Sequence, residues 1–202
     1  MKSFSEIDTN AKRASKSVGF SWGVSEEVGK NIRLLEMFGL PGIKNLNQYY
    51  KIIKEKKFQN LNLISKENYS KIPYCPIIAG TSFLDQANSL EKLFEIKIKN
   101  ISFPILFIPF VSRASEIIGK RIFLNIDEKD FLLNFNQSIY SNYLSGDILE
   151  TSNEIKIRFI ENKNMFNENE WRELYKLSED TFVEESEELK QTSAGAGLTD
   201  ND

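Results

Sequence analysis

The spacing of apolar residues changes along the chain, and this change limits what the chain can fold into. Up to about residue 53, apolar side chains recur every three or four positions, which predicts amphipathic helices. Two such stripes are Ile7, Ala11, Ala14 and Val18, followed by Val24, Val28, Ile32, Leu35 and Phe38. From residue 94 the apolar residues Phe94, Ile96 and Ile98 alternate, which predicts a half-buried strand. Helices followed by strands indicate an α+β protein.

Capping and turn residues divide the chain further. Ser3 with Glu6 predicts a capping box at the start of the first helix, and Gly39 with Pro41 predicts the end of the second. Later segments predict a mostly antiparallel sheet, short helices and a C-terminal helix. The expected strands are 94–101, 105–108, 121–126, 131–135 and 154–160, and the expected helices are 43–53, 82–90, 112–118 and one that starts near Asn167.

The length of 202 residues and the hydrophobic fraction of 41% suit one domain spanning 1–202. We expect a helical part over 1–72, a sheet-rich part over 73–166, a C-terminal helix over 167–192 and a Gly/Ala tail over 193–202. Charge is uneven along this order. Residues 1–73 hold 13 Lys and Arg against 7 Asp and Glu, whereas residues 179–202 hold one cation against 8 acids. The acidic end and the basic end either attract each other or are two independent solvated faces.

The chain contains no histidine, which excludes the common histidine-dependent catalytic and metal sites. The one cysteine, Cys75, excludes an intrachain disulfide and has no histidine base to activate it, so we expect a small buried side chain there. No metal site and no specific cofactor is predicted. The start of the chain is acidic, and the longest apolar stretch, 101–111, is too short to cross a membrane. A cytoplasmic protein without a membrane partner is therefore expected.

Three segments are candidate sites. Trp22, Glu26 and Glu27 either begin a helix whose dipole stabilises the acids or form an acidic ligand site beside an aromatic ring. The helix interpretation is favoured, because adjacent helical glutamates point about 100° apart. The run 44–57 mixes lysines with Tyr49 and Tyr50, but the pI of about 5.3 favours a solvated helix face, so a nucleic-acid partner is not expected.

The third candidate is the tail, with glycines for flexibility and carboxylates for recognition. Its residues either dock in a pocket, bind a hard cation or form a frayed end. The residues concerned are Gly195, Gly197, Asp200, Asn201 and Asp202.

Both ends of the chain resemble an uncharacterised bacterial family, a domain of unknown function. The family shows Gly-x-x-Trp-Gly-x-x-Glu-Glu, matched here by Gly19, Trp22, Gly23, Glu26 and Glu27. It ends in Gly-Ala-Gly-Ala-Gly-Leu-x-Asp-Asn-Asp, matched by 194–198 and 200–202, while Ser193 departs from the pattern. The resemblance implies that both end motifs have a role, but it names no reaction.

Two functions follow as hypotheses. In the first, the protein is a non-catalytic ligand-binding or accessory protein of small-molecule metabolism and forms a homo-oligomer. Its tail docks near Trp22, Glu26 and Glu27 in its own or a partner subunit, and arginines receive the tail carboxylates. The candidate arginines are Arg13, Arg33 and Arg113. In the second, the protein is a carboxylate-based, magnesium-dependent enzyme that uses Glu26, Glu27, Asp200 and Asp202.

Overall fold

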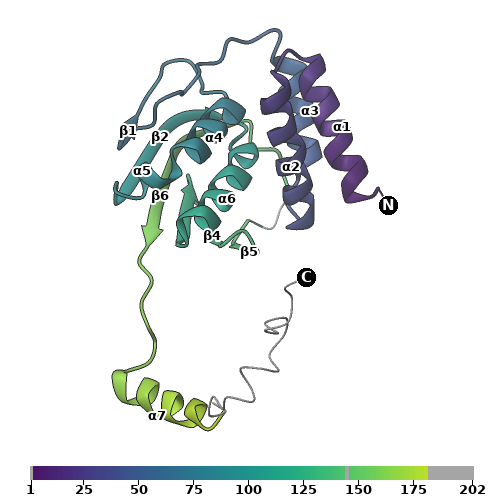
Figure 1. Cartoon of the computed structure of the whole chain (residues 1–202). Coiled ribbons are helices and arrows are strands. Elements are labelled where there is room, and N and C mark those ends of the chain that lie inside the picture. Colours follow the sequence, from purple (N-terminus) through teal and green to yellow (C-terminus); the bar gives the residue numbers. More distant parts are fainter. Residues whose placement is uncertain (1, 144–145, 182–202) are drawn as a thin grey trace, which may run out of the picture. The chain divides into compact units, whose positions relative to one another are not determined.

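The computed structural model describes residues 2–143 and 146–181. The chain divides into two compact units, Met1–Asn162 and Lys163–Asp202, which are described separately. The first unit contains three N-terminal helices, a six-stranded sheet and the helices that cover one face of that sheet (Figure 1). The α+β class and the order of helices before sheet are confirmed.

The three N-terminal helices are α1 (Phe4–Ser17), α2 (Trp22–Met37) and α3 (Gly42–Ile52). The predicted capping box is present, since the Ser3 hydroxyl accepts from the Glu6 amide and the Glu6 carboxylate accepts from the Ser3 amide. The apolar stripes of the helices meet in the core, where Ile32, Leu35 and Tyr49 are at most 2% exposed. Helix α2 packs against both α1 and α3.

The segment from 76 to 118 is more helical than the sequence predicted. It forms α4 (Pro76–Asp85), α5 (Ala87–Leu90), the 3-10 helix η1 (Pro104–Phe107) and α6 (Ile108–Ile118). The expected strand over 105–108 is wrong, because Pro104 is the first residue of η1 and Pro109 is the second residue of α6. In the first turn of a helix a missing N–H costs nothing. The expected helix start at 82 is also wrong, since α4 already begins at Pro76.

The sheet has the order β1-β2-β6-β3-β4-β5. Its strands are β1 (Glu67–Asn68), β2 (Glu95–Ser102), β3 (Arg121–Ile126), β4 (Lys129–Asn134), β5 (Ser138–Ser141) and β6 (Thr151–Ile160). Only the β1–β2 pair is parallel among these described strands, so the sheet is mostly antiparallel as expected. The sequence analysis missed β1 and β5, the two shortest strands, which form the sheet edges.

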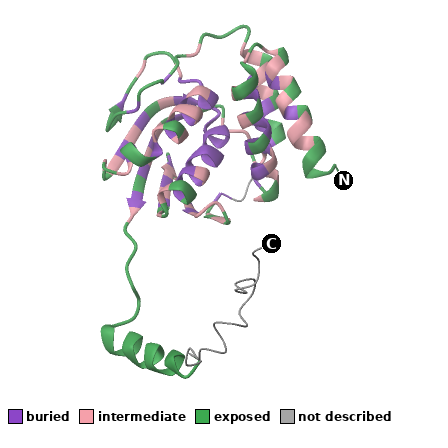
Figure 2. Cartoon of the chain, in the orientation of Figure 1, coloured by how far each residue is buried: buried purple, intermediate pink, exposed green. Residues whose placement is uncertain are grey.

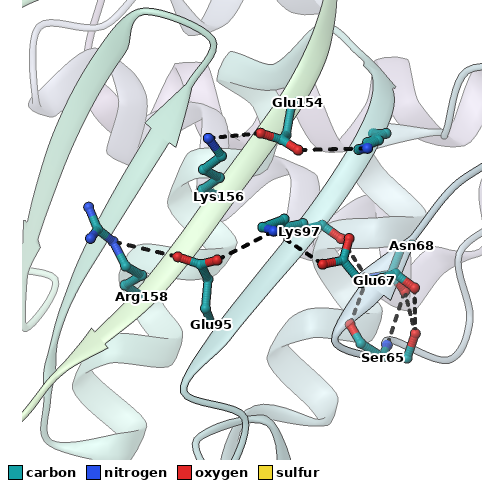
Figure 3. A network of polar contacts seen from close by, with 9 residues as sticks. Ser65, Glu67, Asn68, Glu95, Lys97, Glu154, Lys156 and Arg158 are labelled. Atoms are coloured by element: carbon teal, nitrogen blue, oxygen red, sulfur yellow. Dashed lines mark hydrogen bonds and ion pairs between the residues drawn. The ribbon is translucent and has the colours of Figure 1, made fainter.

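The two faces of the sheet differ in chemistry. Ile96, Ile98, Leu124 and Ile157 are fully buried on the face that α4, α5 and α6 cover (Figures 1 and 2). The alternate residues carry charges on the opposite face, with the helices behind the sheet in this view (Figure 3). There the Lys97 ammonium lies 3.2 Å from Glu67 and 3.7 Å from Glu95. Exposed ion pairs of this kind contribute little to stability, so the covered face holds the fold together.

The second unit contains α7 (Glu168–Glu179). Asn167 caps it, as predicted, by accepting from the Asn169 and Glu170 amides at 2.9 and 3.1 Å. No residue of α7 is buried (Figure 2). The expected helix over 167–192 is confirmed as far as Glu179, and its remainder from 182 lies outside the described residues.

Candidate functional site

The Trp-Gly-x-x-Glu-Glu motif lies at the corner where α1 turns into α2. Gly19 has a φ of +110°, a backbone conformation that favours glycine, and the Ser21 hydroxyl caps α2 by accepting from the Val24 amide at 3.3 Å. Because α2 begins at Trp22, Glu26 and Glu27 lie in its second turn rather than its first. The expected stabilisation of both acids by the helix dipole is therefore wrong, since that effect fades beyond the first turn.

Glu27 forms an ion pair with a residue far along the chain. One of its carboxylate oxygens accepts from Arg113 on α6, and the other accepts from Lys30 at 2.8 Å. Arg113 also donates to the amide oxygen of Asn31 at 3.3 Å. Partial burial would raise the pKa of Glu27, but the hydrogen bonds from Lys30 and Arg113 outweigh it, so this pKa lies below its ordinary value. This pair joins α2 to α6.

A cavity of about 460 Å³ adjoins this ion pair. Helix α2 contributes Gly23, Val24, Glu26 and Glu27 to its lining, α4 contributes Thr81, Leu84 and Asp85, and α6 contributes Arg113. The lining holds three carboxylates and one guanidinium, which is a formal charge of −2. Its volume lies within the range of about 300–1,000 Å³ that is usual for small-molecule sites. We call it the acidic cavity.

Asp85 is the carboxylate in the acidic cavity with the least compensation. Glu27 is paired as described, and Glu26 lies 3.6 Å from the Lys12 ammonium on α1. Among the described residues, no cation lies within ion-pair distance of Asp85. Asp85 is also the last residue of α4, where the negative end of the helix dipole disfavours a carboxylate. Asp85 is exposed, so water solvates its carboxylate when no ligand is bound, and a bound cation would offset both effects.

Asp85 was not among the residues singled out from the sequence, where it was assigned to the start of a helix. The preceding segment could have indicated its position. Cys75 fits a helix cap, and Pro76 fits the first residue of a helix. With the helix begun at Pro76, Asp85 falls at its end.

Of the other predicted site residues that the structure describes, Arg113 lines the cavity, whereas Trp22 and Arg33 do not. Trp22 is 57% exposed, and the Lys16 ammonium lies 5.4 Å from its ring centroid. Arg33 faces Asp8 on α1, with its Nε 3.9 Å from the carboxylate. Arg113 is at the cavity, but its partner there is Glu27. The tail residues Gly195, Gly197, Asp200, Asn201 and Asp202 lie outside the described residues, so their docking stays a prediction.

Cys75 has the buried position that the sequence predicted. Its sulfur caps α4, 3.5 Å from the Ile78 amide, and the buried hydroxyl of Tyr49 donates to it at 3.0 Å. Burial raises the pKa of the Cys75 thiol, which therefore stays neutral and weakly nucleophilic. Since Tyr49 is fully buried, it is also unable to stack on a nucleic-acid base, although the lysines of 44–57 are exposed.

In the part of the chain that the structure describes, no three acids or cysteines come together in a group that could hold a metal ion. No helix in that part is long and apolar enough to span a membrane.

Comparison with known proteins supports the resemblance at the N-terminal end. Residues 2–75 match the model of a family described as a protein of unknown function (DUF3726). The matched range contains the motif from Gly19 to Glu27 and the α2 wall of the acidic cavity, whereas Asp85, Arg113 and the tail lie beyond it. No curated protein and no solved structure matches the chain.

Proposed function

We propose that this protein is a non-catalytic binding protein for a small molecule that bears an amine. The observation that carries the proposal is Asp85, a carboxylate without an ion-pair partner among the described residues, in a cavity of about 460 Å³ whose lining is acidic. A ligand ammonium would neutralise this carboxylate and form charge-assisted hydrogen bonds with it. The function is thus recognition of a cation by geometry already present in the fold.

The residues that line the acidic cavity have different roles in this proposal. Asp85 and Glu26 come from different helices and are the acceptors for the ammonium. Val24 and Leu84 supply apolar surface for the carbon skeleton of the ligand. Glu27 is already bound to Arg113 and Lys30, so it holds α2 against α6 and keeps the cavity in shape.

Calorimetry with phenethylamine tests the proposal, with 2-phenylethanol as an uncharged probe of similar shape. We expect phenethylamine to bind and the variant Asp85→Asn to bind it about tenfold more weakly, because a charge-assisted hydrogen bond is lost. Glu128→Gln is the matched control, since it removes one exposed acid from the β3–β4 turn, away from the cavity. Equal affinity of Asp85→Asn and the unchanged protein would refute the proposal.

The other sequence-based expectations remain predictions. These are a role as an accessory protein of small-molecule metabolism, a cytoplasmic location, assembly into a homo-oligomer and docking of the tail. The alternative hypothesis, a magnesium-dependent enzyme, needs Asp200 and Asp202, which lie outside the described residues. Of its other two acids, Glu27 is already engaged by two cations.

A further inference from the structure

A second cavity, of about 470 Å³, lies next to the same α1–α2 corner. Val24 lines both this cavity and the acidic cavity. The remaining walls differ, because they come from the corner residues 19–21, from α3 and the chain that follows it, and from the start of α4. We call it the aromatic cavity. The charge of its lining is positive, whereas that of the acidic cavity is negative.

Aromatic rings form much of the wall. Phe20, Tyr49 and Phe58 line the cavity, and Val24, Ile53 and Ile78 add aliphatic surface. The rings of Tyr49 and Phe58 meet edge to face, with centroids 5.2 Å apart, so this part of the wall is held in place by packing. Apolar walls with a few polar groups are typical of small-molecule sites.

The charge of the lining comes from one residue. Lys56 lines the aromatic cavity, and no acid is among its lining residues. Within the described ranges, no carboxylate lies within ion-pair distance of the Lys56 ammonium. Lys16 adds positive charge nearby, since its ammonium lies 3.4 Å from the carbonyl oxygen of Phe20. An anionic ligand group is thus favoured, and a cationic one is disfavoured.

Apart from Lys56, the polar groups of the wall are neutral. Tyr49 and Cys75 both line the cavity and are joined by the 3.0 Å hydrogen bond from hydroxyl to sulfur. Because burial keeps both groups protonated, they add no negative charge to the wall. Asn60 and Ser21 are further neutral polar groups of the lining.

From these walls and this charge, we infer that the aromatic cavity binds a small carboxylic acid with an aromatic or branched apolar body. The ligand carboxylate pairs with Lys56, and its body packs against Phe20, Phe58 and Ile78. This site is separate from the acidic cavity, so the inference does not depend on the proposed amine site. The shared residue Val24 makes the two sites neighbours with opposite charge preference.

The single cysteine of the chain supplies a local readout, because Cys75 lines this cavity. The experiment measures the rate at which iodoacetamide alkylates Cys75 in the full-length protein, with phenylacetate, phenylacetamide or phenethylamine present. At ten times its Kd, phenylacetate should slow alkylation about tenfold. Phenylacetamide should protect more weakly, and phenethylamine should not protect at all.

Variants at two neighbouring lysines test the assigned counter-charge. Lys56→Gln should weaken protection by phenylacetate about two- to fivefold, the range for a solvent-exposed ion pair. Lys57→Gln is the matched control, because Lys57 is exposed and does not line the cavity, and it should leave protection unchanged. Three results would overturn the inference: no protection by phenylacetate at millimolar concentration, equal protection by phenethylamine, or equal weakening in both lysine variants.

Discussion

At the scale of single residues, the ion pair between Glu27 and Arg113 shows what sequence spacing leaves open. The sequence marked both residues as site candidates, yet it paired Arg113 with the tail carboxylates rather than with Glu27. The two residues are 86 positions apart, and only the packing of α2 against α6 brings them together. Long-range pairs of this kind have no local pattern. The residue type was therefore predictable and the partner was not.

This ion pair predicts how stability depends on pH. At pH 7, Glu27→Gln should lower the free energy of unfolding by about 1 kcal/mol, a modest value because both side chains keep some contact with water. Since the pKa of Glu27 is lowered in the folded state, its contribution is present above the ordinary value of 4.5 and is lost as pH falls through the lowered pKa. Urea unfolding at pH 7 and pH 3.5 measures this. A destabilisation of equal size at both pH values would contradict it, and Glu128→Gln serves as the control.

At the scale of elements, the segment from 76 to 118 is where the structure differs most from the sequence-based prediction. Pro104 and Pro109 were interpreted as the two ends of a strand, but Pro104 is the first residue of η1 and Pro109 the second residue of α6. A short apolar run bounded by prolines fits either structure, because its pattern does not separate a buried strand from a buried helix. Ile105, Phe107 and Ile108 are fully buried, as in a segment enclosed on all sides. Strands β2, β3 and β6 are buried mainly on one face, so their apolar residues alternate, and all three were predicted.

The contact between α4 and α6 provides a prediction at this scale. Gly80 on α4 faces the ring of Phe110 on α6, and a Cβ added at Gly80 would overlap with that ring. Gly80→Ala should therefore destabilise the protein by about 1–3 kcal/mol through overpacking, even though alanine favours helix. Gly23→Ala is the matched control, because a Cβ at that helical position meets nothing within 4 Å. Thermal unfolding compares the two, and equal melting temperatures would show that α4 and α6 are not packed this closely.

At the scale of the whole molecule, the sequence predicted N-terminal helices followed by a sheet and a C-terminal helix, whereas the order of strands within the sheet could not be predicted. The last strand in sequence, β6, lies between β2 and β3 and pairs with both. Nothing in its alternating pattern distinguishes such a central position from an edge. The acidic cavity depends on the same kind of long-range arrangement, since its walls come from three helices. Asp85 was missed for a local reason, since the helix was expected to begin at 82 rather than at Pro76.

The central place of β6 predicts where the first unit can be truncated. Every buried apolar residue of the described chain lies between Ala11 and Phe159, so a chain of residues 1–162 should unfold cooperatively by itself. In that chain, the amides of Ile155 and Ile157 should be among the best protected from hydrogen exchange, because β6 is paired on both sides. A chain of residues 1–150 is only slightly shorter but lacks β6, which leaves β2 and β3 without their shared partner, and it should not fold. Circular dichroism and hydrogen exchange on the two chains decide the matter. Cooperative unfolding of the shorter chain would show that the sheet is not built around β6.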